Sequence, residues 1–135
     1  MNAQPNLTAP SYVARILAEH GLRPRKGLGQ NFLVDRNTLD KIVAAAELTP
    51  NDVVFEIGAG IGTLTRALAA EAKRVISVEI DPGMLAVLRE TTQDLNNLRI
   101  IQADVLKMDI PSVWAEEGVA KVKVVANLPY CITTP

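Results

Sequence analysis

The segment VVFEIGAGIG, at residues 53–62, joins a β-branched run to three alternating glycines. Residues 53–57 have the composition of a buried strand, and residues 63–72 have the spacing of a helix. A turn between a strand and a helix brings backbone N–H groups to a helix start, where a ligand can approach them. Glycine is needed there because a Cβ atom would block the turn or the ligand. The segment therefore predicts a ligand-binding turn at the edge of a sheet.

Strands and helices alternate through the rest of the chain. Further β-branched runs lie at residues 74–79, 98–102 and 121–126, with helical patterns from Asp81 to about Asp94 and near Pro111 to Glu117. Strands that alternate with helices form parallel sheets with right-handed crossovers and helices on both faces. The predicted fold class is therefore α/β, a Rossmann-like half that is truncated after its fourth strand.

The segment before the first strand is predicted to contain two helices and a basic loop. Ser11 is the predicted N-cap of the first helix, and a glycine-containing loop without helical or strand period follows at residues 23–33. Asp35 or Asn37 is predicted to cap the second helix.

The composition of the 135 residues is that of a globular protein, with 48% hydrophobic and 21% charged residues. It excludes a disordered tail, a collagen and a coiled coil. The net charge of −1 gives no global sign of nucleic-acid or membrane-surface binding. Residues 1–41 carry six basic and three acidic residues, whereas residues 42–135 carry eight and twelve. Any affinity for RNA is therefore expected to be local.

The cysteine content and the N-terminal residues bear on the cellular compartment. Cys131 is the only cysteine and cannot form an internal disulfide. Residues 1–5 lack the charged start and the apolar run of a signal peptide. No apolar stretch approaches the roughly 20 residues that span a bilayer. We predict a cytoplasmic protein without a membrane partner.

Two acidic residues follow predicted strands at the edge where the glycine turn lies. Glu79 ends the second strand, 21 positions after Gly58, and its carboxylate can accept hydrogen bonds from both hydroxyls of a ribose. Asp104 follows the third strand and is placed to accept a hydrogen bond from the amine of an adenine. The alternative interpretation of Asp104 is a helix cap or a solvated loop residue.

A glycine turn with a distant acid serves nicotinamide dinucleotides as well as S-adenosylmethionine. A dinucleotide fingerprint has its third glycine five positions after the first, where this chain has Thr63. The chain instead has three alternating glycines preceded by Glu56. This pattern favours S-adenosylmethionine.

The tetrapeptide Asn127-Leu128-Pro129-Tyr130 directly follows the fourth predicted strand. The Asn127 side-chain oxygen and the Leu128 carbonyl can each accept one N–H of an adenine amine and aim its nitrogen at a methyl sulfonium. Pro129 makes the backbone rigid, and the Tyr130 ring offers a surface on which an extruded base stacks. This chemistry requires neither a metal nor a covalent nucleophile.

Five motifs resemble, in order and spacing, those of the ribosomal RNA adenine dimethyltransferases, which belong to the N6-adenine methyltransferases with an Asn/Asp-x-Pro-Tyr/Phe signature. The motifs are QNFL at 30–33, EIGAG at 56–60, VEID at 78–81, ADVL at 103–106 and NLPY at 127–130. The resemblance covers about residues 22–135. Leu128 favours the small-subunit enzymes, since the large-subunit antibiotic-resistance enzymes more often have Ile there.

The resemblance implies S-adenosyl-L-methionine as the cofactor and small-subunit rRNA, in the immature 30S subunit, as the partner. Asn31 and Leu33 would close over the methionine end of the cofactor, and Asn127 would bridge cofactor and target base. The implied reaction transfers methyl groups to N6 of two adjacent adenines, twice each, in the 3′-terminal hairpin of 16S rRNA. The residues implied to contact the cofactor are Asn31, Leu33, Gly58, Gly60, Glu79, Asp104 and Asn127.

The resemblance also divides the chain and shows where it departs from the family. Residues 1–35 would be an N-terminal helix with a basic arm that closes over the cofactor, and residues 36–135 the N-terminal part of the methyltransferase domain. Ala59 stands where many relatives have proline. The family continues with three more strands, a second aromatic wall and a helical RNA-binding domain, so the chain is expected to bind cofactor but to be inactive alone. Its fourth strand would expose an unpaired edge, which predicts self-association.

Several side chains have a functional and a structural interpretation. Arg23, Arg25 and Lys26 form an arm that contacts RNA phosphates if the resemblance holds, and a solvated loop otherwise. His20 is interpreted as a residue at a helix end and not as a catalyst. Cys131 is interpreted as a small buried apolar residue.

Functions of three classes remain open. The first is an rRNA dimethyltransferase, of the small-subunit type or, alternatively, of the large-subunit antibiotic-resistance type. The second is a non-catalytic RNA-binding or ribosome-assembly module that keeps the cofactor fold. The third is half of a nicotinamide-dependent dehydrogenase, which binding of S-adenosylhomocysteine without binding of NAD would exclude.

Overall fold

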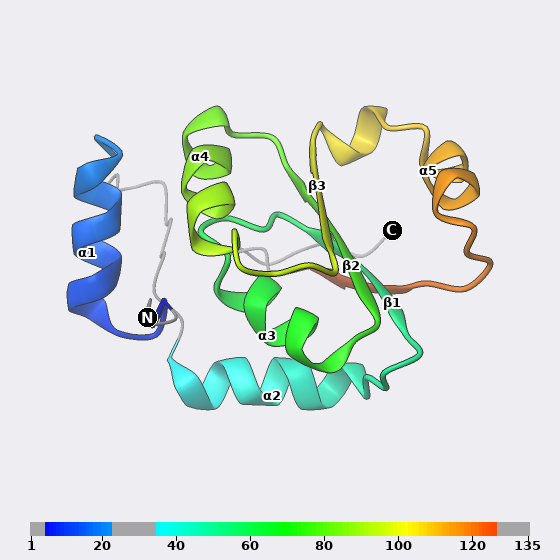
Figure 1. Ribbon diagram of the computed structural model, residues 1–135, viewed down its shortest axis with the longest axis horizontal. Coiled ribbons are helices and arrows are strands. Elements are labelled where there is room, and N and C mark those ends of the chain that lie inside the picture. The colour runs from blue at the N-terminus through cyan, green and yellow to red at the C-terminus, as the bar shows by residue number, and fades with distance from the viewer. Residues whose placement is uncertain (1–4, 23–34, 127–135) are drawn as a thin grey trace.

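The computed structural model describes residues 5–22 and 35–126, and these form a parallel sheet flanked by helices (Figure 1). The strands are β1 (Val53–Ile57), β2 (Arg74–Glu79), β3 (Leu98–Gln102) and β4 (Lys123–Ala126). They pair in the order β3-β2-β1-β4, and every pair is parallel. The predicted α/β class is therefore confirmed. The fourth strand begins at Lys123, two residues after the predicted start at Lys121.

The helices lie on both faces of the sheet, as the alternating pattern predicts. The helices are α1 (Pro10–Glu19), α2 (Arg36–Ala46), α3 (Thr63–Glu71), α4 (Pro82–Thr91) and α5 (Ile110–Glu117), with a short 3-10 helix, η1 (Val105–Lys107). Apolar side chains of α2, α3 and α4 pack on one face, and those of α5 pack on the other. No helix in the described ranges is long and apolar enough to cross a membrane.

The helix ends correct two of the predictions. Helix α1 begins at Pro10, and no side chain caps it, so the prediction of Ser11 as N-cap is wrong. Proline at the first helical position supplies a suitable φ and has no N–H to leave unpaired. Asp35 caps α2, since its carboxylate accepts a hydrogen bond of 2.8 Å from the Thr38 N–H. Helix α4 ends at Thr91 and not near Asp94.

The two faces of the sheet bury different side chains because successive residues of a strand point to opposite sides. Val54 and Val75 pack against Leu64 and Leu68 of α3, and all four are almost completely buried. On the opposite face, the ring of Phe55 meets the ring of Trp114 of α5 edge to face, with centroids 5.0 Å apart. Burial of these apolar side chains is the main stabilising contribution to the sheet.

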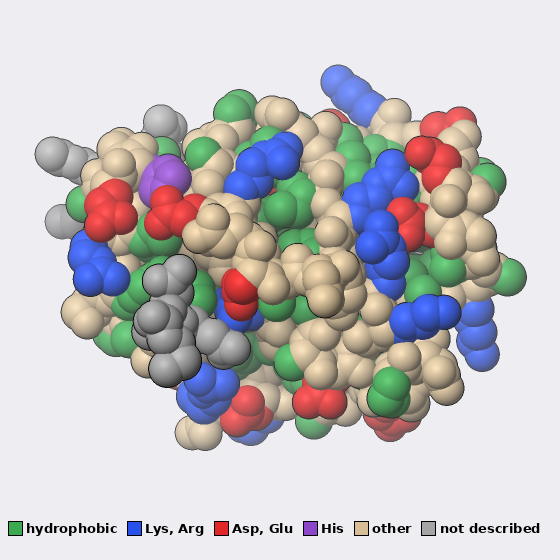
Figure 2. Space-filling view, in the orientation of Figure 1, with side chains coloured by type: hydrophobic (Ala, Val, Ile, Leu, Met, Phe, Trp, Pro, Cys, Tyr) green, Lys and Arg blue, Asp and Glu red, His purple; other side chains and the backbone are tan. Residues whose placement is uncertain are grey.

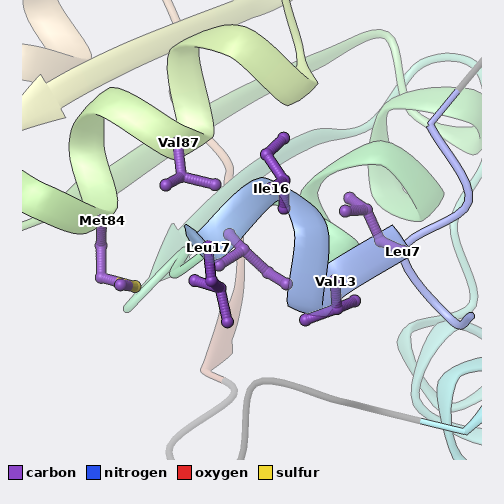
Figure 3. Packing of buried hydrophobic residues seen from close by; sticks show 7 residues of the cluster. Leu7, Val13, Ile16, Leu17, Met84 and Val87 are labelled. Carbon is purple, nitrogen blue, oxygen red and sulfur yellow. The ribbon is translucent and has the colours of Figure 1, made fainter. Parts of the chain in front are cut away.

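Helix α1 packs on α4 and on the glycine turn (Figure 3). Val13, Ile16 and Leu17 of α1 belong to one buried cluster with Met84 and Val87 of α4. The buried side chain of Ile61, from the turn itself, belongs to the same cluster. His20, the C-cap residue of α1, places its Nε2 3.0 Å from a carboxylate oxygen of Glu90, which confirms its interpretation as a helix-end residue. The N-terminal helix is therefore part of the structure that supports the turn.

Lys123 connects the start of β4 to the end of α2. Its Nζ donates hydrogen bonds to the carbonyls of Ala46 and Glu47, at 3.1 and 2.6 Å, and lies 3.1 Å from the Asp52 carboxylate. The nearby Lys123 and the Thr49 N–H lower the pKa of Asp52, with the Thr49 hydrogen bond as the larger cause. Helix α2 ends here because Glu47 adopts a left-handed conformation, with φ of 49°.

Candidate functional site

The glycine turn connects β1 to α3, where the sequence predicts it. Gly58, Gly60 and Gly62 have φ values of 75°, 59° and 99°, a region in which side chains with a Cβ are strained. The N–H groups of Gly58 and Ala59 donate to the Val78 carbonyl of β2, at 3.0 and 3.2 Å. Within residues 5–22 and 35–126, a Cβ built on Gly60 would have no atom within 4 Å. Gly60 is thus required by its backbone conformation and not by crowding from the described part of the chain.

Glu79 lies at the carboxyl end of β2, and its carboxylate binds the backbone of the glycine turn. One carboxylate oxygen accepts a hydrogen bond of 2.7 Å from the Gly60 N–H, and the other accepts one of 3.0 Å from the Asp81 N–H. Glu79 is 8% exposed, so these hydrogen bonds are shielded from water. Each carboxylate oxygen can accept more than one hydrogen bond, so hydroxyl donors can still be added. No local pattern in the sequence indicates that Glu79 also organises the turn.

Asp104 follows β3 and caps η1. One of its carboxylate oxygens accepts a hydrogen bond of 3.0 Å from the Leu106 N–H. The interpretation as a helix cap is therefore confirmed, while the contact with an adenine stays a prediction. Its position at the edge that carries Glu79 is supported by pairing, since Gln102 is in register with Glu79.

Exposed apolar side chains follow both acids. Ile80 comes directly after Glu79 and is 59% exposed, and Leu106 lies two residues after Asp104 and is 90% exposed. Single exposed apolar side chains are common on protein surfaces, and at this edge they provide a surface that can contact the flat face of a ring. The edge thus offers both hydrogen-bond acceptors and apolar surface.

The fourth strand brings the chain to the same edge. Ala126, its last residue, is in register with Ile57, which directly precedes the glycine turn. Ten of the residues that were interpreted from the sequence lie outside the described ranges: Arg23, Arg25, Lys26, Asn31, Leu33, Asn127, Leu128, Pro129, Tyr130 and Cys131. Of the predicted site, the structure therefore brings together the glycines, Glu79 and the end of β4.

The sequence profile of the family described as ribosomal RNA adenine dimethylase matches residues 21–135. The chain belongs to this family. Its curated relatives include the ribosomal RNA small subunit methyltransferases A of Leuconostoc mesenteroides, 51% identical over 132 residues, and of Lysinibacillus sphaericus, 47% identical over 132 residues. Each match covers 96% of this chain and 45% of the relative. The chain therefore spans less than half the length of these adenine dimethylases.

Solved structures of related methyltransferases share the fold. The 23S rRNA methyltransferase ErmE aligns with a TM-score of 0.54 and 45% identity, over 58% of this chain and 32% of that protein. A dimethyladenosine transferase from Plasmodium falciparum aligns with a TM-score of 0.58 and 33% identity, over 71% of this chain and 33% of that protein. The predicted Rossmann-like methyltransferase fold and the predicted family are confirmed. Membership of a methyltransferase family decides against the dehydrogenase interpretation.

The residues at the edge fit the cofactor class of the family, S-adenosylmethionine. The carboxylates of Glu79 and Asp104 supply acceptors for the hydroxyl and amine donors of an adenosine group. Gly60 has no side chain, so a ligand can approach its backbone closely. Helix α3 has no side-chain cap at Gly62, so its first N–H groups are not engaged by a capping side chain. The hydroxyl of Thr63, at this helix start, is buried and has no hydrogen-bond partner in the described part of the chain.

Another carboxylate, that of Glu56, lies inside the core, two residues before the first glycine of the turn. It is completely buried, and one oxygen accepts hydrogen bonds from the hydroxyls of Thr65, at 2.5 Å, and Ser77, at 2.7 Å. The other oxygen has no partner within residues 5–22 and 35–126. Burial raises the pKa of Glu56 to about 7, against the lowering effect of the two hydroxyls. In the sequence, Glu56 stands out as a charged residue within the β-branched run at residues 53–57.

Glu56 makes the stability of the fold dependent on pH. Its pKa is raised from 4.5 to about 7 in the folded state, so the folded protein binds more protons than the unfolded chain in this window. Stability therefore falls as the pH rises through it. We expect Glu56→Gln, which carries no titrating proton, to gain about 2 to 3 kcal/mol relative to the wild type between pH 5 and pH 8. Urea unfolding at both pH values measures this difference.

The control for this experiment is Glu116→Gln on α5, whose side chain is 59% exposed. Its stability difference from the wild type should be the same at both pH values, because exposed pairs contribute little. A Glu56→Gln difference that does not change with pH would contradict a protonated, buried Glu56.

Proposed function

We propose that the edge formed by the glycine turn, Glu79 and Asp104 binds S-adenosyl-L-methionine. The observation that carries the proposal is the bond between the Glu79 carboxylate and the Gly60 N–H, because it joins the predicted ribose acceptor to the predicted backbone cradle. Gly58 and Gly60 would contact the cofactor through their backbone, and Glu79 would accept bonds from the ribose hydroxyls. Asp104 would accept a bond from the adenine amine with the carboxylate oxygen that does not cap η1.

The residues outside the described ranges complete the proposed site. Asn31 and Leu33 would cover the methionine end of the cofactor, and Asn127 would contact both cofactor and target base. When bound, the cofactor supplies a methyl group that is activated by a positively charged sulfur. The amine of adenine is a poor nucleophile, since its lone pair is delocalised into the ring. Two acceptors, the Asn127 side chain and the Leu128 carbonyl, would orient this amine while Tyr130 stacks on the base.

We infer that the methyl acceptor is N6 of two adjacent adenines in the 3′-terminal hairpin of small-subunit rRNA, in the immature 30S subunit. The support is the family and the names of the curated relatives, which are ribosomal RNA small subunit methyltransferases A. The residues proposed to contact RNA phosphates are Arg23, Arg25 and Lys26. On the face shown in Figure 2, basic and acidic side chains of the described residues are interspersed. These residues form no extended basic area for RNA on that face. Such a protein would act in the cytoplasm.

A large-subunit acceptor is the second candidate, because the 23S rRNA methyltransferase ErmE is 45% identical over the aligned part. The Leu at position 128 favours the small subunit. A non-catalytic ribosome-assembly module is the third. Transfer of tritiated methyl groups by the intact protein separates the three: we expect labelling of immature small subunits only. Labelling of large subunits would establish the second candidate, and cofactor binding without any labelling the third.

The 135 residues by themselves are proposed to bind the cofactor without transferring methyl groups. We expect Glu79→Ala to weaken binding of S-adenosylhomocysteine by about 1.5 to 3 kcal/mol, since a charge-assisted hydrogen bond is lost and ribose hydroxyls are left without acceptors. Isothermal titration calorimetry measures the change. The wild type should not bind NAD under the same conditions.

The matched control is Glu116→Ala on α5, which should bind as the wild type does. Circular dichroism would establish that both variants are folded. An unchanged dissociation constant in folded Glu79→Ala would refute the assignment of Glu79 to the cofactor site.

We propose further that the chain self-associates through β4. This strand pairs only with β1 in the described sheet, and Val124 on it is 60% exposed. Exposed strand edges with apolar side chains recruit other strands. We expect light scattering to detect dimers or larger species, and Val124→Lys to shift them toward monomers because an edge lysine opposes pairing. A wild type that is monomeric at all concentrations would count against this proposal.

A further inference from the structure

We propose that Thr91, near the end of α4, is a positioning residue for the glycine turn. Its hydroxyl donates a buried hydrogen bond of 2.7 Å to the carbonyl of Ile61, 30 residues earlier in the chain. Thr91 is completely buried, so water does not compete for this bond. The inference rests on the proposed function, because the turn it positions is the proposed cofactor cradle.

The peptide that joins Ile61 to Gly62 transmits this contact to the backbone N–H groups. A trans peptide is planar, and its C=O and N–H groups point in opposite directions. A hydrogen bond that fixes the direction of the Ile61 carbonyl therefore fixes the direction of the Gly62 N–H. Gly62 is the N-cap residue of α3, and its N–H donates to the Ala59 carbonyl at 3.2 Å within the turn. Thr91 thus sets the orientation of a peptide at the helix start.

The fit between Thr91 and the turn is close. A Cβ atom built on Gly62 would lie 2.6 Å from the Thr91 hydroxyl oxygen, nearer than real Cβ contacts. Gly62 also has a φ of 99°, which disfavours any other residue. The third glycine of the turn is therefore explained by the approach of α4 and not only by the approach of a ligand.

A second contact holds Thr91 itself in place. The guanidinium of Arg66, on α3, donates a hydrogen bond of 2.8 Å to the Thr91 carbonyl and two, of 2.6 and 3.0 Å, to the Asp94 carboxylate. This pairing lowers the pKa of Asp94, with the Arg66 hydrogen bond as the largest cause. Helix α3 is thereby connected to the end of α4. The turn is held by two side chains, the Glu79 carboxylate at Gly60 and the Thr91 hydroxyl at Ile61.

The neighbouring Thr92 provides a matched control. It is 3% exposed, and its hydroxyl donates to the Leu88 carbonyl of its own helix at 2.6 Å. The Thr91 hydroxyl also approaches the Leu88 carbonyl, at 3.2 Å, but is closer to Ile61. Both threonines are thus buried at one helix end and contact the same helix carbonyl, and the bond to the Ile61 carbonyl distinguishes them.

The experiment compares Thr91→Val, which keeps the shape but removes the hydroxyl, with Thr92→Val. We expect Thr91→Val to raise the dissociation constant of S-adenosylhomocysteine about tenfold, as the loss of one buried hydrogen bond implies. Thr92→Val should change it by less than about twofold, and Thr91→Ser, which keeps the hydroxyl, should restore binding. If Thr91→Val does not fold, Thr91→Cys, with its weakly donating thiol, replaces it.

Amide hydrogen exchange supplies a readout that does not depend on the ligand. In Thr91→Val, exchange at Gly60 and Gly62 should accelerate more than exchange in the strands, whereas Thr92→Val should leave the ratio unchanged. A merely structural role of Thr91 would accelerate exchange throughout the sheet. Equal effects of Thr91→Val and Thr92→Val, or a loss of binding in Thr91→Ser, would overturn the inference.

The two readouts also separate this inference from the proposed function. If the wild type does not bind S-adenosylhomocysteine, the proposed function fails, and the exchange ratio alone decides the role of Thr91. If the wild type binds and Thr91→Val binds equally well, the positioning role fails while the cofactor site stands.

Discussion

The hydrogen bond from the Gly60 N–H to the Glu79 carboxylate is the contact on which the site depends. The turn contains three residues with positive φ, and such a segment has many alternative conformations in the unfolded chain. A buried carboxylate must find donors, because leaving its charge without them costs several kcal/mol. Glu79 finds them in backbone N–H groups on both sides of the edge, at Gly60 and Asp81. These hydrogen bonds thus supply the donors that the buried carboxylate needs, and they also fix the conformation of the turn.

Two glutamates near the turn have different surroundings. Glu56 receives two hydroxyl donors on one oxygen and none, in the described part of the chain, on the other. Burial is the dominant influence on Glu56 and raises its pKa to about 7, and the nearby Glu79 raises it further. Glu79 has a donor for each oxygen. Glu56 is thus a buried carboxyl group of the core, whereas Glu79 serves as the acceptor that organises the turn.

The sequence predicts the features that depend on local patterns. Alternating β-branched runs locate all four strands, and the glycines locate the turn between β1 and α3. Ser11 is a poor predictor of the first helix because Pro10, one residue earlier, can itself start a helix. Contacts between distant segments leave no local signal: nothing around Thr91 indicates a bond to Ile61, and nothing around Glu79 indicates that it holds Gly60. The strands and the position of the glycine turn were therefore predictable, whereas the contacts that shape the turn required the tertiary structure.

The register of β4 determines where the strand reaches the edge that carries the glycine turn, and two contacts along the strand set this register. Lys123 binds the carbonyls at the end of α2, and Val125 packs among the side chains of α2 and α3. A shift of one residue would move the strand by about 3.3 Å and turn Val125 to the other face of the sheet. Both contacts would then be lost. Ala126 consequently lies opposite Ile57, the residue that directly precedes the glycine turn. A lysine far from the proposed chemistry thereby specifies the point from which Asn127 follows.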